Sequence, residues 1–195
     1  MLTKLRKLYR DSVRPLVSLL VRLGVNANHL TLLSLILALI YIPLLIKGWL
    51  PAAIVLILLM GFLDAIDGEV ARQSGTASPL GSFLDSFIDR IVDVVIIGGL
   101  IFLQFDVILV YVLAVTSLLI SYCRAKGEAL RIKMEGVGLI ERAERIIMIV
   151  MVLLLYYILG FWYSYIVFII LLILSVITLF QRVLHIVLAF KESKR

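Results

Sequence analysis

The sequence predicts an all-α fold: an integral membrane bundle of six transmembrane helices, preceded by an N-terminal amphipathic helix at the membrane interface. Of its 195 residues, 63% are hydrophobic and only 16% are charged, whereas soluble domains are roughly 45–50% apolar and 25% charged. The hydrophobic residues fall in runs of about 20, the length that a helix needs to cross about 30 Å of hydrocarbon. No internal repeat or low-complexity linker divides the chain, so residues 1–195 are expected to form one domain.

The first 24 residues are expected to lie on the membrane surface. In residues 2–24, Lys and Arg alternate with Leu and Val at roughly helical spacing, a pattern typical of a helix in the interfacial plane. Gly24 and the two following asparagines mark a turn. Asn28 is the expected N-cap of the first span.

Six spans are expected within the bundle of residues 25–190. They cover 30–46, 50–63, 83–105, 107–122, 146–161 and 163–184. The second is short only because Asp64 and Asp67 end its apolar run, and a helix that continued through Arg72 would have full length. Gly98 and Gly99 would let the third span approach a neighbouring helix closely.

The basic residues predict the orientation. Lys and Arg cluster before the first span, after the last, and around the second and fourth connections, while the other three connections together hold only Lys47. The positive-inside rule then places both termini, the second connection and the fourth connection on the cytoplasmic side of the cell membrane. Topology and anionic lipid explain the net charge of +6, so no nucleic-acid partner is expected. The single cysteine, Cys123, excludes an internal disulfide.

Four aspartates stand at the ends of two apolar runs, in the stretch DAIDGEVARQSGTASPLGSFLDSFIDR. Asp64 and Asp67 are three residues apart, which puts them on one face of a helix. Asp85 and Asp89, four residues apart, share a face of the next helix in the same way. The connection between the helices contains Gly, Ser and Pro and suits a tight turn. The two faces are therefore expected to meet and to bring the four carboxylates into one site.

Such a cluster predicts a phosphate group bound through metal. Carboxylates this close repel one another unless cations separate them, and oxygen ligands without His or Cys select Mg²⁺, Mn²⁺ or Ca²⁺. Four carboxylates could hold two such ions. Gly68 and Ala71 leave room for a ligand, and Arg72 has the forked donor that suits phosphate. The competing interpretation, structural salt bridges to Arg72 and Arg90, explains one aspartate more readily than all four.

These positions resemble the signature of a known family. The residues spell D-x-x-D-G-x-x-A-R and, after eight residues, G-x-x-x-D-x-x-x-D, carried by Asp64, Asp67, Gly68, Ala71, Arg72, Gly81, Asp85 and Asp89. This is similar to the motif of the CDP-alcohol phosphotransferases. The resemblance implies a membrane enzyme that moves a phosphatidyl-type group from a CDP-linked lipid to an alcohol and releases CMP. It also implies two ions of Mg²⁺ or Mn²⁺ per active site, and a homodimer.

The resemblance assigns roles to individual residues. Asp64, Asp67 and Asp85 match metal ligands. Asp89 matches a ligand that is also the general base toward the attacking hydroxyl. Contacts to the CDP-linked lipid are implied for the motif and for the turn before the first span, at Ala27, Asn28, His29, Leu30, Thr31, Gly68, Ala71, Arg72 and Ser78.

The fourth connection predicts a phosphorylated acceptor. Its last residues, E-R-A-E-R at 141–145, enter the fifth span directly, and a pair of arginines there suits a substrate phosphate. The stretch resembles that of the phosphatidylinositol phosphate synthases and their archaeal-lipid counterparts, the archaetidylinositol phosphate synthases, which use inositol phosphate. Ala143 stands where the bacterial pattern usually has proline. The residues expected at the acceptor phosphate are Arg124, Arg131, Arg142, Arg145 and Arg182.

Two other functions stay open on the sequence alone. One keeps the same chemistry and takes glycerol 3-phosphate as acceptor, which makes a phosphatidylglycerophosphate. The other is a divalent-cation transporter, which would place its carboxylates near mid-membrane rather than at helix ends. The sequence does not distinguish Mg²⁺ from Mn²⁺, nor a donor lipid with ester-linked acyl chains from one with ether-linked isoprenoid chains.

Overall fold

The computed structural model describes residues 13–192, which are helical with short connections and contain no β-strand. This confirms the all-α prediction. A helix over residues 13–22 precedes α2 (Ala27–Ile46), α3 (Leu50–Ser74), α4 (Pro79–Gly99), the 3₁₀ turn η1 (Leu100–Leu103), α5 (Val107–Ala129), α6 (Arg142–Leu159) and α7 (Phe161–Glu192).

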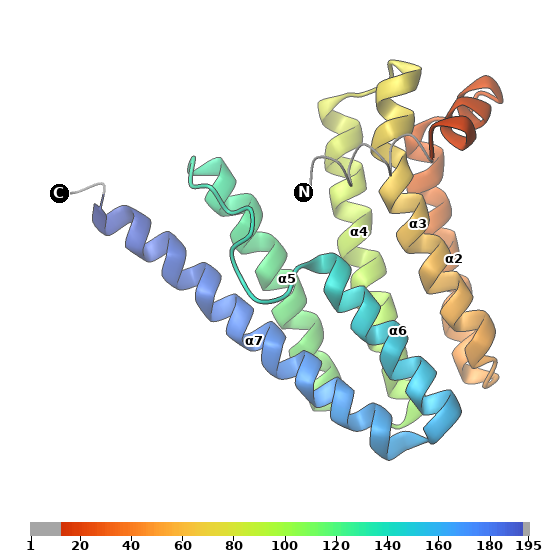
Figure 1. Ribbon diagram of the computed structural model, residues 1–195, viewed down its shortest axis with the longest axis vertical. Coiled ribbons are helices and arrows are strands. Elements are labelled where there is room, and N and C mark those ends of the chain that lie inside the picture. Colours follow the sequence, from red (N-terminus) through yellow and green to blue (C-terminus); the bar gives the residue numbers. More distant parts are fainter. Residues whose placement is uncertain (1–12, 193–195) are drawn as a thin grey trace.

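The six long helices form a bundle in which successive helices run in opposite directions (Figure 1). The start of α2, the α3–α4 turn and the end of α7 lie towards one end of the bundle. The short connections α2–α3, η1–α5 and α6–α7 lie at the other end (Figure 1). Helix α4 packs against α2 on one side and α5 on the other. Helix α6 contacts both α3 and α7.

Four of the helices, α2, α3, α5 and α7, are long and apolar enough to cross a membrane. The charged residues of the other two explain why they differ. In α4 the aspartates at 85, 89 and 93 and Arg90 interrupt the apolar run, and α6 is only 18 residues long and begins with Arg142, Glu144 and Arg145. Four helices therefore meet the length and composition of a membrane span, whereas six spans were expected, and the two that do not, α4 and α6, differ by their charged residues.

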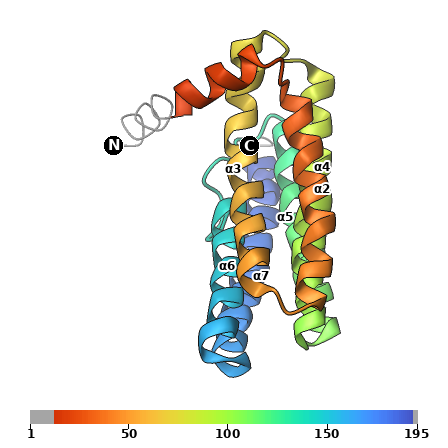
Figure 2. The ribbon, with the colours of Figure 1, turned by 90° about the vertical axis from the view of Figure 1, so that its right-hand side faces the viewer.

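The helix over residues 13–22 crosses the end of the bundle at a steep angle to the other helices (Figure 2). Its Val13 and Val17 are buried in a small core with Leu63, Ile66 and Val70 of α3. Burial of these apolar side chains fixes the helix to the end of α3. Residues 1–12, which hold most of the expected amphipathic pattern, lie outside the described residues.

The helix boundaries correct the sequence prediction in two places. Asn26, rather than Asn28, is the N-cap of α2, because the His29 ring accepts a hydrogen bond from the Asn26 backbone N–H and closes the first turn earlier. The third apolar run does not stay α-helical to residue 105, since α4 ends at Gly99 and η1 follows it. By contrast, α3 continues through Arg72 to Ser74, as expected.

Close packing of α2 against α4 depends on Gly99. A Cβ atom at this position would lie 2.5 Å from Cε1 of Tyr41, closer than real side chains approach. The Tyr41 ring is fully buried, and its hydroxyl donates to the Ile96 carbonyl across the two helices at 3.2 Å. The expectation of close helix contact at Gly98 and Gly99 is therefore confirmed for Gly99, whereas a side chain at Gly98 would meet open space.

Candidate active site

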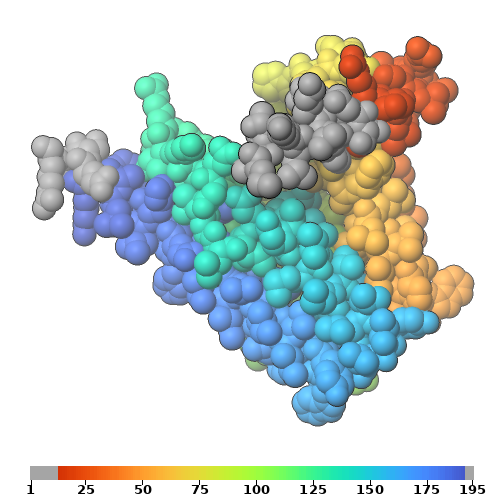
Figure 3. Space-filling model, in the orientation of Figure 1, coloured from red at the N-terminus to blue at the C-terminus, as the bar shows by residue number. Residues whose placement is uncertain are grey.

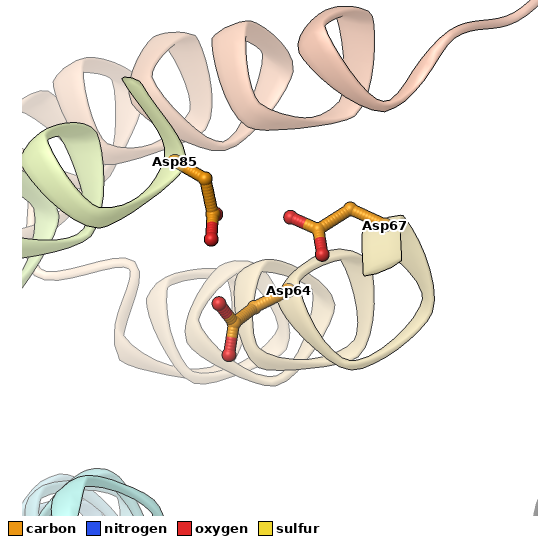
Figure 4. A group of neighbouring side chains, drawn as sticks. All are labelled: Asp64, Asp67 and Asp85. Atoms are coloured by element: carbon orange, nitrogen blue, oxygen red, sulfur yellow. The ribbon is translucent and has the colours of Figure 1, made fainter. Parts of the chain in front are cut away.

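Three aspartates from two helices face one another near the α3–α4 turn. Asp64 and Asp67 project from α3 towards Asp85 of α4 (Figure 4). One carboxylate oxygen from each residue lies within 4.8 Å of the others. The structure thus brings together three of the four aspartates singled out in the sequence.

The turn between α3 and α4 fixes this geometry through its two helix caps. Gly75 ends α3 in the left-handed conformation, with φ of 70°, where a residue without Cβ is favoured. Ser78 begins α4, and its hydroxyl accepts a hydrogen bond from the Gly81 backbone N–H at 3.0 Å. The connection therefore contains only residues 75–78, and the two aspartate-bearing helix ends stay side by side.

The three carboxylates fit a divalent cation. Asp67 is 8% exposed, and Oδ1 of Asp85 is buried without a hydrogen-bond partner among the described residues. Like charges at this separation repel, and a buried oxygen without a partner is costly. A hard cation such as Mg²⁺ or Mn²⁺ takes oxygen ligands of this kind and relieves both penalties.

A cavity of about 230 Å³ opens directly beside these aspartates. Asp67 and Asp85 form part of its wall, so a ligand in the cavity would touch any cation they hold. Most of the residues expected to contact the CDP-linked lipid line it, namely Ala27, Asn28, Thr31, Gly68, Ala71, Arg72 and Ser78. Thr76, Ala77 and Ser82, which the sequence reasoning did not single out, complete the wall together with Gly81.

The other two residues expected at the lipid nucleotide lie outside this cavity wall. His29 uses its ring nitrogen in the cap of α2, and Leu30 is 4% exposed within the small core beneath helix 13–22. Positions 27, 28 and 31 face the cavity, while 29 and 30 turn away from it, because successive residues of a helix point in different directions.

Gly68 and Arg72 form the α3 side of the cavity. A Cβ atom at Gly68 would meet only the Arg72 guanidinium, with Nη1 at 3.7 Å, so the space beyond it belongs to the cavity. The Arg72 Nη2 pairs with Oε2 of Glu69 at 2.6 Å, and the side chain is 62% exposed. Arg90 donates to the Ser86 carbonyl in its own helix. In the structure, these two arginines are therefore engaged with groups other than the four aspartates.

The cation that contacts the aspartates is Arg142, at the first position of α6. Its Nη1 lies 2.9 Å from Oδ1 of Asp64 and 2.8 Å from Oδ2 of Asp89. Because α6 packs against α3, its start lies within reach of Asp64 and Asp89. On the face in Figure 3, α6 runs between α7 and α3. Arg142 thus links the fourth aspartate, Asp89, to the cluster.

One further acidic residue was missed by the sequence reasoning. Asp93 is 7% exposed, and both of its carboxylate oxygens accept from Nε of Arg142, at 3.1 and 3.3 Å. Arg145 is also buried, and its Nη2 lies 3.9 Å from Oδ2 of Asp93. The available signal was register, because Asp85, Asp89 and Asp93 follow one another at four-residue intervals on one face of α4.

The remaining arginines expected at an acceptor phosphate lie in other surroundings. Arg182 of α7 donates to the backbone carbonyls of Ile120 and Val137, at 2.9 and 3.0 Å. Arg124 pairs with Glu128 on the exposed end of α5, at 3.0 Å. Arg131 stands in the turn after α5 with φ of 62°. Of the five, only Arg142 and Arg145 contact the aspartates of α4.

Sequence comparison connects the chain to a family of known chemistry. The profile of the CDP-alcohol phosphatidyltransferases matches residues 25–187. The archaetidylinositol phosphate synthase of Aeropyrum pernix is 40% identical over 151 residues, which is 75% of this chain and 76% of that protein. The enzyme of the same name from Methanothermobacter thermautotrophicus is 34% identical over 187 residues, 95% of this chain and 94% of its own. The phosphatidylinositol phosphate synthase of Corynebacterium glutamicum is 38% identical over 154 residues, 73% and 68% of the two chains.

Solved structures share the fold. The crystal structure of Mycobacterium tuberculosis phosphatidylinositol phosphate synthase with CDP-DAG bound matches with a TM-score of 0.78 and 29% identity, over 88% of this chain and 92% of that one. The same enzyme in complex with manganese and citrate also matches with a TM-score of 0.78, over 88% and 87% of the two chains.

Proposed function

This chain belongs to the CDP-alcohol phosphatidyltransferase family, and we propose that it transfers a phosphatidyl-type group from a CDP-linked lipid to a hydroxyl of inositol phosphate. Membership makes it a transferase of phospholipid synthesis. The observation that carries the proposal is the cluster of three facing carboxylates, of which Asp67 and Asp85 lie on the wall of a 230 Å³ cavity. The relatives named as inositol phosphate lipid synthases support the choice of acceptor.

The cavity is the proposed site of the cytidine diphosphate of the donor. Gly68 and Ala71 keep the α3 wall open, and Arg72 supplies a cation at the rim. Asn28 and Ser78 offer polar groups for the nucleotide. The Mycobacterium tuberculosis structure with CDP-DAG bound supports a donor of this class.

Asp64, Asp67, Asp85 and Asp89 are the proposed ligands of two divalent cations, Mg²⁺ or Mn²⁺. Such ions, when bound, neutralise the diphosphate charge and stabilise the departing CMP. The chain's own contribution is to hold three carboxylates within 4.8 Å of one another on two capped helices. The manganese complex of the Mycobacterium tuberculosis enzyme supports a divalent cation in this fold.

Asp89 is the proposed general base. The acceptor oxygen forms a bond to the phosphorus that carries the lipid, and the bond from that phosphorus to the bridging oxygen breaks. The bridging oxygen leaves on CMP, and the acceptor proton passes to the Asp89 carboxylate. Asp89 lies one helical turn beyond Asp85 and 2.8 Å from Nη1 of Arg142, between the donor and acceptor sides of the site.

Arg142 and Arg145 are the proposed ligands of the acceptor's own phosphate. Arg142 already lies among the carboxylates that would face the reacting centre. Arg145 is 3% exposed, and both of its terminal nitrogens are buried without a hydrogen-bond partner among the described residues. A phosphate oxygen is the natural partner for such donors. We restrict the proposed acceptor site to these two arginines, because Arg124 pairs with Glu128 and Arg182 donates to backbone carbonyls, while Arg131 stands in the turn after α5.

We further propose that all six long helices cross the cell membrane, with the aspartate end facing the cytoplasm, and that the enzyme is a homodimer. The alternation of helix directions (Figure 1) supports six crossings. The concentration of Lys and Arg at the ends that carry the aspartates supports the orientation. The dimer rests on the family resemblance.

CMP release by the purified protein tests the proposal. The protein is incubated with Mg²⁺ and either CDP-diacylglycerol or its ether-linked CDP-archaeol analogue, and inositol 1-phosphate, glycerol 3-phosphate, free inositol or serine is added separately. We expect CMP release with inositol 1-phosphate alone. CMP release with glycerol 3-phosphate alone would support the proposed metal site and show that the acceptor is glycerol 3-phosphate instead of inositol phosphate. Failure with every pair would refute the transfer reaction, and the two donors decide between acyl and ether lipids.

A further inference from the structure

Asp93 is a buried carboxylate with two arginine neighbours and no assigned role. It lies on α4 four residues after Asp89, and its side chain is 8% exposed. A carboxylate at this depth is stable only with compensating partners. Those partners are Arg142 and Arg145, the same two residues proposed to bind the acceptor phosphate.

The contact with Arg142 fixes the orientation of its guanidinium. Both oxygens of Asp93 accept from Nε, at 3.1 and 3.3 Å, which engages the inner edge of the group. Nη1, on the outer part, lies 2.8–2.9 Å from Asp89 and Asp64. Because the guanidinium is planar, holding Nε on Asp93 determines where the terminal nitrogens point.

The contact with Arg145 is electrostatic rather than hydrogen-bonded. Its Nη2 lies 3.9 Å from Oδ2 of Asp93, beyond hydrogen-bond distance. Nη1 and Nη2 therefore stay available although both are buried. The two arginines and Asp93 line one small cavity together with Ser117 of α5. Asp93 thus compensates the charge of Arg145 without occupying its donors.

We propose that Asp93 is a positioning residue for the acceptor: it orients Arg142 and neutralises the buried Arg145, so that both present N–H groups to the acceptor phosphate. The inference rests on the proposed function. It differs from a purely structural ion pair in one respect that can be measured. Loss of the Asp93 charge should weaken binding of the phosphorylated acceptor and leave binding of the CDP-linked lipid unchanged, because neither Asp93 nor the two arginines line the donor cavity.

The first test is Asp93→Asn in the full-length protein, which keeps the shape and removes the charge. We expect the KM for inositol 1-phosphate to rise roughly ten- to a hundred-fold, the range for losing a hydrogen bond between charged groups. The KM for the CDP-linked lipid should stay within about two-fold. Calorimetric titration of inositol 1-phosphate into the detergent-solubilised protein should show the same loss of affinity without turnover.

Asp106→Asn is the matched control. Asp106 caps α5 at the opposite end of the bundle, where its Oδ1 accepts from the Leu109 backbone N–H at 3.0 Å. Asparagine keeps that acceptor, so this variant should retain both KM values. Asp93→Glu, which keeps the charge, should recover part of the acceptor affinity, and it provides the test if Asp93→Asn does not fold.

A double-mutant cycle identifies the route. If Asp93 acts through Arg142, Asp93→Asn combined with Arg142→Lys should have an acceptor KM close to that of the worse single variant. Additive effects, or equal increases in the KM for donor and acceptor, would overturn the inference. So would an unchanged acceptor KM in Asp93→Asn. If the wild-type protein released no CMP with any acceptor, the proposed function itself would fail, which is a separate outcome.

Discussion

Two groups of polar residues in the same bundle have opposite kinds of partner. At the start of α6, Arg142 and Arg145 meet the side chains of Asp64, Asp89 and Asp93. On α7, three residues bind the backbone of the α5–α6 connection instead: Thr178 accepts from the Ile140 N–H, Arg182 donates to the Val137 carbonyl, and His185 contacts the Lys133 carbonyl. We call the first group, together with the neighbouring Asp67 and Asp85, the acidic site and the second the α7 anchor.

The difference shows which group can bind a ligand. In the α7 anchor, the hydrogen-bond partners are backbone groups that a ligand would have to displace, and the contacts hold residues 133–140 against α7. In the acidic site, Oδ1 of Asp85 and both terminal nitrogens of Arg145 are buried without hydrogen-bond partners among the described residues. An arginine inside an apolar helix is therefore not in itself a sign of a catalytic site. Its hydrogen-bond partners show whether it can bind a ligand.

The largest effect is expected from Asp89→Asn in the acidic site. Loss of a general base lowers turnover by roughly 10²–10⁴-fold, and the amide keeps the size of the side chain, so the protein should stay folded. CMP release and the thermal unfolding midpoint of the purified variant measure the two properties. Asp106→Asn serves as the control, and an active Asp89→Asn enzyme would remove the general-base role.

Substitution of one glycine beside the α7 anchor and of one glycine at the donor cavity should have different effects on stability and on substrate binding. Gly138 has φ of 115°, and a Cβ there would lie 2.5 Å from Cγ2 of Thr178, so Gly138→Ala should lower the free energy of unfolding by about 1–3 kcal/mol. Gly68 has room for a Cβ but faces the donor cavity. Gly68→Leu should therefore raise the KM for the CDP-linked lipid with little change in stability. An unstable Gly68→Leu protein with a normal KM for the CDP-linked lipid would contradict the assignment of Gly68 to donor binding.

Arg182→Ala should affect stability rather than acceptor binding. It leaves the Val137 carbonyl without its donor and removes a second hydrogen bond from the Ile120 carbonyl, which lies within α5. Loss of the partner of a buried polar group costs about 1–3 kcal/mol. The thermal midpoint should fall while the KM for inositol 1-phosphate stays within about two-fold of wild type. If the acceptor KM rose and the midpoint did not change, Arg182 would belong to the acceptor site.

The smallest effect is expected from Thr178→Val. The substitution keeps the shape and removes the hydroxyl that accepts from the Ile140 backbone N–H at 3.2 Å. The Ile140 N–H is then buried without an acceptor, which costs about 1–3 kcal/mol, so denaturant unfolding should show a loss near the lower end of this range and CMP release should be normal. A large loss of activity would mean that the α7 anchor also shapes the acidic site.

Local patterns in the sequence predicted the helices and the aspartates, because both depend on nearby residues. The apolar runs place all six long helices. The spacing of Asp64 with Asp67, and of Asp85 with Asp89, predicts that each pair shares one face of its helix. The N-cap of α2 was predicted wrongly, since the choice of Asn26 over Asn28 depends on a single contact with the His29 ring. The close approach of Gly99 to Tyr41 joins two different helices, and local patterns do not show which residue a glycine packs against.

Long-range pairing accounts for what the sequence did not show. Asp93 and Arg142 are 49 residues apart, and no periodicity within one helix predicts that α6 packs against α3. The sequence singled out Arg142 and Arg145 as a pair at the start of the fifth span, but it did not exclude Arg124, Arg131 and Arg182 from the acceptor site. Only the fold separates Arg142 and Arg145, which meet carboxylates, from Arg182, which meets backbone carbonyls.

The most direct test of the account follows the acceptor's phosphate. The purified protein is incubated with Mg²⁺, a CDP-linked lipid and inositol 1-phosphate carrying ³²P, and the lipid product and CMP are quantified together. We predict a radioactive lipid formed in equal amount to CMP, because the acceptor phosphate held by Arg142 and Arg145 is retained in the product. CMP release without label in the lipid, or no CMP at all, would contradict transfer to an inositol phosphate.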